Sequence, residues 1–128
     1  RLPMAWASVA LLRLYGTELP VEVWHLPGEM TAAAASLFEL VQATPRCLRA
    51  ATKGYYTKPH AVHETGFDEV VLIDDDMVPL SRLDGLLQEP AYREHGALLT
   101  PDFGDVRDRS WFPEPWSRMG LAAPACLE

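Results

Sequence analysis

Three consecutive aspartates, Asp74, Asp75 and Asp76, are the residues in this sequence best suited to chemistry. In extended backbone the side chains at positions i and i+2 point the same way, so Asp74 and Asp76 are expected to converge while Asp75 faces elsewhere. Neighbouring carboxylates repel each other unless a cation lies between them. Hard oxygen ligands suit Mn²⁺ or Mg²⁺, which keep coordination positions open for phosphate oxygens. The pattern predicts a metal site that neutralises a departing diphosphate; an ordinary acidic turn is the alternative.

The aspartates follow an apolar segment that should position them. Residues Phe67 to Ile73 are expected to form a strand, because Val70–Ile73 is a continuous apolar run of the kind that is buried on both faces of a parallel sheet. In open α/β sheets, ligands bind beyond the carboxyl ends of the strands. A strand that ends in Asp-x-Asp is therefore a more specific signal than the three aspartates alone.

The other expected elements alternate between helix and strand, which indicates an α/β layered domain with a mostly parallel sheet. The first helix is apolar nearly all round, so burial between layers is expected for it. Pro45 is expected to mark the end of the second helix, and Ser81 to open a capping box. The predicted helices are Met4–Tyr15, Thr31–Gln42, His60–Glu64 and Ser81–Gln88, the further strands are Val21–Trp24, Cys47–Ala50 and Ala97–Leu99, and residues 104–128 are expected to be irregular.

Composition sets limits on the partners. The chain has 128 residues, enough for one domain, and carries 18 acidic against 11 basic residues. This balance argues against a nucleic-acid binder and means that an anionic substrate needs a specific cation. Lys58, one of two lysines, is a candidate for that role.

No apolar run approaches the roughly 20 residues of a membrane span, so a membrane anchor is expected only outside this chain. Cys47 and Cys126 could be paired or free.

Several short segments, taken together, resemble the α-mannosyltransferase family of fungal Golgi enzymes. Their order and spacing match over about residues 9 to 103, which is stronger evidence than any single segment. The segments are Leu19-Pro20-Val21-Glu22-Val23, Lys58-Pro59-His60, Phe67 to Leu80 with its Asp-x-Asp and Val78-Pro79-Leu80, Gly96-Ala97-Leu98 and Pro101-Asp102-Phe103.

The resemblance implies a GT-A (Rossmann-like) nucleotide-diphospho-sugar transferase fold, of which this chain would be an incomplete domain. It implies transfer of mannose from GDP-mannose to a glycan acceptor, with retention, in the Golgi lumen at the membrane and with Mn²⁺ as cofactor. Asp74 and Asp76 would bind the metal, Lys58 would lie near the donor, and Asp102 near the sugar or acceptor. Asp75 stands where relatives carry a small residue and would add negative charge beside the donor. No catalytic nucleophile or base is assigned.

Two alternatives remain open. A haloacid-dehalogenase-type phosphotransferase would use Asp74 as nucleophile and Asp76 as acid/base. That motif normally ends the first strand of its fold and needs a later lysine, whereas no lysine follows Lys58 here. The absence of a later lysine also weakens the comparison with a receiver signalling domain. The second alternative is a non-catalytic remnant with a glycosyltransferase-like core.

Overall fold

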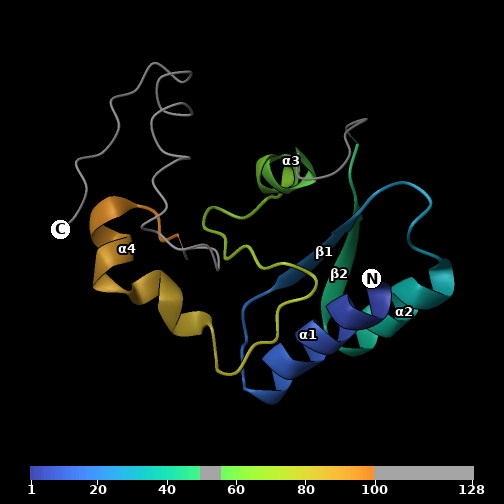
Figure 1. Ribbon diagram of the computed structural model, residues 1–128, viewed down its shortest axis with the longest axis horizontal. Coiled ribbons are helices and arrows are strands. Elements are labelled where there is room, and N and C mark those ends of the chain that lie inside the picture. Colours follow the sequence, from blue (N-terminus) through green and yellow to red (C-terminus); the bar gives the residue numbers. More distant parts are fainter. Residues whose placement is uncertain (50–55, 100–128) are drawn as a thin grey trace, which may run out of the picture. The chain divides into compact units, whose positions relative to one another are not determined.

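The computed structural model describes residues 1–49 and 56–99. The chain divides into two units, Arg1–Gly96 and Ala97–Glu128, and the helices and strands of the described residues belong to the first unit. Figure 1 shows these elements, which in chain order are α1 (Leu2–Leu14), β1 (Val21–His25), α2 (Ala32–Leu40), β2 (Ala43–Cys47), α3 (Thr57–Glu64), the 3₁₀ helix η2 (Asp84–Gln88) and α4 (Pro90–His95).

A β-α-β unit forms the centre of the fold. Strands β1 and β2 pair in parallel, with Val21 opposite Ala43 and His25 opposite Cys47, and α2 connects them. Helix α2 begins where Thr31 accepts a hydrogen bond from the backbone N–H of Ala34 at 3.1 Å, a typical N-cap contact. The predicted α/β class and parallel pairing are thus confirmed for a small two-stranded sheet.

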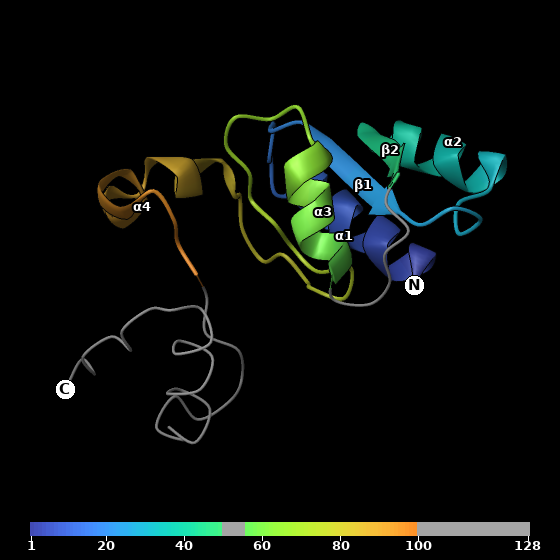
Figure 2. The same ribbon diagram turned by 90° about the horizontal axis from the view of Figure 1, so that it is seen from above.

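The apolar core lies between this sheet and the first two helices. Phe38 of α2 is 1% exposed and contacts Val9 of α1 and Ala43 of β2 in one buried cluster. Val21 and Val23 of β1 pack against the same cluster. Because side chains alternate along a strand, Glu22 and Trp24 belong to the opposite face of β1. Figures 1 and 2 show α3 on that opposite side, away from α1 and α2.

Helix α1 is confirmed within two residues of its predicted start, but its burial is one-sided. Val9 and Leu12 are buried, whereas Met4 and Leu14 are 52% and 77% exposed. The expectation that this helix is buried all round is therefore wrong for the described residues. The two-stranded sheet and α2 cover one face of α1, so they leave its other apolar positions open to solvent.

Strand β2 begins earlier than predicted. It covers Ala43–Cys47 rather than Cys47–Ala50, and α2 ends at Leu40, two residues before the predicted Gln42. The physical cause is the tight connection between them, where Gln42 adopts a positive φ of 56° and Arg13 hydrogen-bonds the Val41 and Gln42 carbonyls. Pro45 is tolerated inside β2 because, within residues 1–49 and 56–99, this strand pairs on one side only.

The predicted strand Phe67–Ile73 is wrong: these residues lie outside any helix or strand. Val70 and Leu72 are 37% and 53% exposed, so the run is not buried on both faces. Ala97–Leu99 also lies outside any strand. A strand exists only through hydrogen bonds to a neighbour, and an apolar run does not specify that neighbour.

The region after Leu80 forms two short helices. In place of the helix expected from Ser81, the structure has η2 without a side-chain cap and then α4. Asp84 accepts hydrogen bonds from Glu18 N–H and Arg82, so it joins two loops instead of extending a helix. Pro90 in the first turn and Gly96 at φ 73° bound α4, a helix that was not predicted from the sequence. The predicted tail 104–128 lies outside the described residues.

Candidate functional site

Helix α3 carries Lys58 at its start. The helix begins at Thr57, so Pro59 lies in the first turn, where its missing N–H costs no helical hydrogen bond. The predicted helix His60–Glu64 is confirmed, with one turn added at its N-terminal end. Lys58 thus extends from a regular element rather than from the loop expected before it.

The three aspartates occupy a tight turn. The N–H of Met77 donates to the Asp74 carbonyl at 3.1 Å, so Asp75 and Asp76 are the central residues of that turn. The extended backbone expected for these residues is therefore wrong, and the convergence of Asp74 and Asp76 on one ion stays a prediction. Asp74 and Asp75 are half-buried and Asp76 is exposed.

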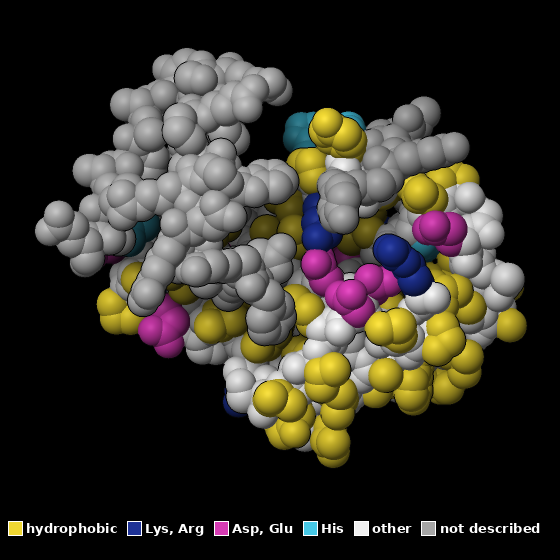
Figure 3. All heavy atoms as spheres, viewed as in Figure 1, with side chains coloured by type: hydrophobic (Ala, Val, Ile, Leu, Met, Phe, Trp, Pro, Cys, Tyr) yellow, Lys and Arg dark blue, Asp and Glu magenta, His cyan; other side chains and the backbone are white. Residues whose placement is uncertain are grey.

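The structure brings Lys58 to Asp74. Lys58 Nζ lies 2.6 Å from Asp74 Oδ1, and the two side chains are 42% and 44% exposed. An ion pair this open to solvent stabilises a fold by about 0–1 kcal/mol, so it leaves both groups able to change partners. Figure 3 shows acidic side chains gathered at the centre of one face with basic side chains directly beside them. Both residues were expected at one donor site from the sequence, and the structure places them in contact.

Glu22 fixes the far end of α3. Its carboxylate, 7% exposed, accepts hydrogen bonds from the Thr65 hydroxyl at 2.7 Å, Trp24 Nε1 at 3.1 Å and Arg46 Nε at 2.9 Å. Thr65 is the residue at which α3 ends. The Glu64 carboxylate also accepts a hydrogen bond from Arg49 N–H at 3.3 Å, beyond the end of β2. Helix α3 is therefore attached to both strands, which positions Lys58.

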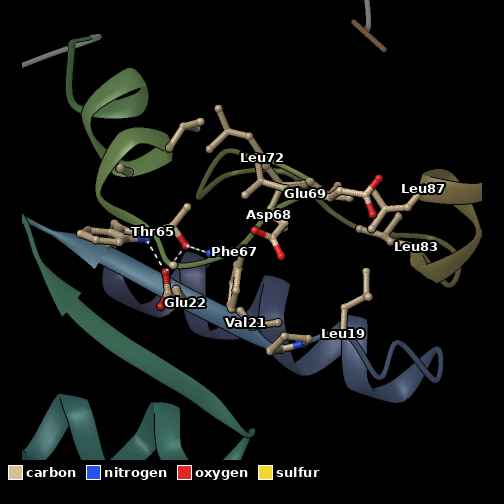
Figure 4. A pocket seen from close by; sticks show the side chains of 18 of the residues that line it. Leu19, Val21, Glu22, Thr65, Phe67, Asp68, Glu69, Leu72, Leu83 and Leu87 are labelled. Atoms are coloured by element: carbon tan, nitrogen blue, oxygen red, sulfur yellow. Dashed lines mark hydrogen bonds between the residues drawn. The ribbon is translucent and has the colours of Figure 1, made fainter. Parts of the chain in front are cut away.

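A cavity of about 430 Å³ lies between β1 and the segment 67–73. Figure 4 shows Glu22 and Thr65 at one end and Leu83 and Leu87 at the other, with Leu72 across from β1. Its walls are mostly apolar, and Asp74, Asp75 and Asp76 are not among its lining residues. The cavity adjoins the aspartate turn through Ile73 but is separate from it.

Comparison with known sequences decides the family. The family described as "Mannosyltransferase putative" matches residues 1–117. The chain belongs to this family. It is 30% identical over 112 residues to the α-1,2-mannosyltransferase MNN2 of Saccharomyces cerevisiae, an alignment covering 78% of this chain and 19% of that protein. It is 28% identical over 131 residues to the α-1,2-mannosyltransferase MNN22 of Candida albicans, covering 91% and 22%.

This mannosyltransferase-family chain spans about a fifth of the length of those two relatives. No solved structure matches it. Among residues 1–49 and 56–99, no helix has the length and apolar character needed to cross a bilayer.

Asp74 and Asp76 could supply only some of the ligands that a hard cation needs. Within the described ranges, no group of three or more His, Cys, Asp or Glu side chains is placed to hold a metal ion. Mg²⁺ and Mn²⁺ commonly bind through one or two carboxylates, with water and substrate phosphates as the other ligands. Asp74 and Asp76 fit that mode, because they are open to solvent and supply oxygen donors. They do not form a protein-only cage.

Two further residues, Asp102 and Glu22, bear on the site. Asp102 lies outside the described residues, so its predicted place near the sugar or acceptor stays a prediction. Glu22 was missed as a positioning residue, although an acidic residue between Val21 and Val23 in a predicted strand was a usable signal. Thr65, its partner, carried no such signal, because the contact joins positions 43 residues apart.

Proposed function

We propose that this chain forms the donor-site part of a metal-dependent mannosyltransferase that moves mannose from GDP-mannose to a glycan acceptor. Family membership supports mannosyl transfer, and both relatives are named as α-1,2-mannosyltransferases. The proposal includes a GT-A fold for the whole domain and residence at the Golgi membrane. A small parallel α/β unit is consistent with that fold.

The contact between Lys58 and Asp74 carries the proposal. It joins two residues 16 positions apart that the family resemblance assigned to one donor site, with Lys58 Nζ 2.6 Å from Asp74 Oδ1. In a chain with a net charge of −7, a diphosphate needs local positive charge. Lys58 supplies one such charge beside the aspartate turn. Family membership supports sugar-transfer chemistry in this chain, and the ion pair supports our proposal that the diphosphate binds beside Lys58.

The chain's own residues would bind and orient the donor. Asp74 and Asp76 would hold Mn²⁺ or Mg²⁺, and such an ion, when bound, stabilises the negative charge that develops on a leaving diphosphate. Lys58 would bind a phosphate oxygen, with α3 held in place by Glu22 and Thr65. Asp75 would favour a diphosphate whose charge is neutralised by a metal ion, because the Asp75 carboxylate repels a diphosphate without one. Asp102 is proposed to contact the sugar or acceptor.

The phosphotransferase alternative is disfavoured by two observations. The family match covers residues 1–117 and therefore includes the aspartate turn. The haloacid-dehalogenase motif also requires Asp74 at the end of a strand, whereas the residues before it lie outside any strand. The non-catalytic remnant is distinguished by experiment, since a remnant would fold without binding donor.

A thermal-shift panel tests the proposal. The 128-residue chain is heated with GDP-mannose, UDP-glucose or GDP, each with and without Mn²⁺. The expected result is a raised Tm with GDP-mannose and GDP only when Mn²⁺ is present, because a ligand stabilises the state that binds it. Absence of any Mn²⁺-dependent shift in a cooperatively unfolding chain would contradict the proposal. A preference for UDP-glucose would keep the metal site but change the donor.

A further inference from the structure

Lys58 and the proposed cation share one carboxylate. Lys58 Nζ lies 2.6 Å from Asp74 Oδ1, and Asp74 is also a proposed metal ligand. The Lys58 ammonium would repel a divalent cation bound at Asp74, because both carry positive charge. The Asp74 carboxylate is also already paired with Lys58. Cation binding in the presence of this pair is therefore weaker than the same carboxylates alone would allow.

We propose that Lys58 exchanges partners, pairing with Asp74 in the ligand-free chain and with a phosphate oxygen when a nucleoside diphosphate binds. This inference rests on the function proposed above and concerns how that site is loaded. The exchange releases the Asp74 carboxylate at the moment the diphosphate arrives. Cation and diphosphate binding thereby become mutually dependent, and the coupling must be equal in both directions.

The geometry allows this exchange at low cost. Both side chains are a little over 40% exposed, so water can replace either partner during the movement. Lysine carries its charge on a flexible four-carbon stem with three donors that can be redirected. The other end of α3 is held by the Thr65–Glu22 hydrogen bond of 2.7 Å and by the Glu64 contact with Arg49 N–H. The movement we propose is therefore one of the Lys58 side chain, with α3 held in place.

The coupling distinguishes exchange from a simple effect of charge. If Lys58 acted only through its field, its neutralisation would raise cation affinity equally with and without diphosphate. If Lys58 leaves Asp74 for the phosphate, its neutralisation raises cation affinity only in the chain without diphosphate. An exposed ion pair limits the rise to about fivefold, the equivalent of about 1 kcal/mol.

The test measures Mn²⁺ affinity from the EPR signal of free Mn²⁺, with and without saturating GDP, after correction for Mn²⁺ bound by GDP in solution. It uses the 128-residue chain, Lys58→Gln, Lys58→Arg and the control Arg82→Gln. Arg82 is a basic residue of similar exposure that pairs with Asp84. Circular dichroism checks that each variant folds like the parent chain.

The expected result is a gain of roughly two- to fivefold in Mn²⁺ affinity for Lys58→Gln without GDP, and no gain with GDP. Lys58→Arg should retain most of the coupling because it keeps the charge, and Arg82→Gln should leave it unchanged. An equal gain in both states would overturn the exchange while leaving the proposed donor site intact. Absence of Mn²⁺ and GDP binding by the parent chain would overturn the proposed function, and the exchange with it.

Discussion

Thr65 donates its hydroxyl proton to the Glu22 carboxylate at 2.7 Å and thereby joins the end of α3 to the middle of β1. The contact spans 43 positions in the sequence. Because Lys58 lies at the other end of the same eight-residue helix, this hydrogen bond and the sheet behind it determine where its ammonium group can reach. Glu22 therefore helps to position Lys58 beside Asp74 through the opposite end of α3.

Replacement of Glu22 by Gln should destabilise the fold. Glu22 Oε2 accepts hydrogen bonds from Thr65 and Trp24, and its Oε1 accepts one from Arg46. Glutamine keeps only one acceptor oxygen, and its NH₂ group cannot accept, so at least one of these donors loses its partner. A nearly buried donor left without a partner costs about 1–3 kcal/mol, which is the expected loss in the free energy of unfolding. Urea denaturation followed by tryptophan fluorescence measures it.

The matched control for this change is Glu39→Gln on α2, where the side chain is exposed. It should alter the free energy of unfolding by less than about 0.5 kcal/mol. Equal effects of the two substitutions would show that the Glu22 contacts do not hold α3 to β1.

Replacement of Arg13 should lower the free energy of unfolding strongly. Its guanidinium donates to the carbonyls of Thr17, Leu19, Val41 and Gln42 at 2.7–3.1 Å, which ties the end of α1 to the α1–β1 connection and to the α2–β2 connection. Arg13→Met removes all of these bonds and should cost about 2–4 kcal/mol, since hydrogen bonds from a charged group are the stronger kind.

The comparison for Arg13 is Arg49→Met, an exposed side chain whose loss should be nearly neutral. Both variants are measured by urea denaturation under the same conditions. An Arg13→Met chain as stable as the Arg49→Met chain would contradict the role of Arg13 at the Val41–Gln42 connection.

Asp84 should make the free energy of unfolding decrease at acidic pH. The hydrogen bond from Arg82 holds the pKa of the Asp84 carboxyl below its usual value. A folded-state pKa below the unfolded value means that stabilisation is present above about pH 3.9 and is lost as pH falls through the folded pKa. Asp84→Asn keeps the acceptor for Glu18 N–H but removes this titration.

The check is the urea midpoint of the parent chain and Asp84→Asn between about pH 2 and pH 6, with Asp68→Asn as an exposed control. The difference between parent and Asp84→Asn should be constant near the upper end of that range and shrink below about pH 4. A difference that stays constant down to the lower end would refute the role of the charge.

Local sequence signals predicted those parts of the fold that local contacts decide. The predicted helices Met4–Tyr15 and Thr31–Gln42 and the predicted strand Val21–Trp24 all correspond to elements that the structure contains. The errors occur where a distant contact decides. Arg13 ends α2 early through bonds to residues 28 and 29 positions away. The run Val70–Ile73 has strand composition, but no neighbouring strand pairs with it in the described part of the chain.

The candidate site residues stay a prediction, because only one contact between them is seen. The family resemblance assigned Lys58 and Asp74 to one donor site, and the structure shows the two as an ion pair. The predicted extended backbone of the aspartates was wrong. Asp-rich segments form turns as readily as strand ends, and which of the two forms depends on whether a partner strand is present. The pairing of Glu22 with Thr65 could not be predicted from periodicity, since it follows from the packing of α3 on β1.

The most direct test of the donor site is calorimetric titration of the 128-residue chain with GDP-mannose in the presence of Mn²⁺, repeated with Asp74→Asn, Asp76→Asn and the control Asp68→Asn. We predict saturable binding that requires Mn²⁺, falls at least about tenfold in Asp74→Asn and Asp76→Asn, and is unchanged in Asp68→Asn. Well-folded parent chain that binds no GDP-mannose, or binds it equally without Mn²⁺ and in all three variants, would contradict the metal-dependent donor site.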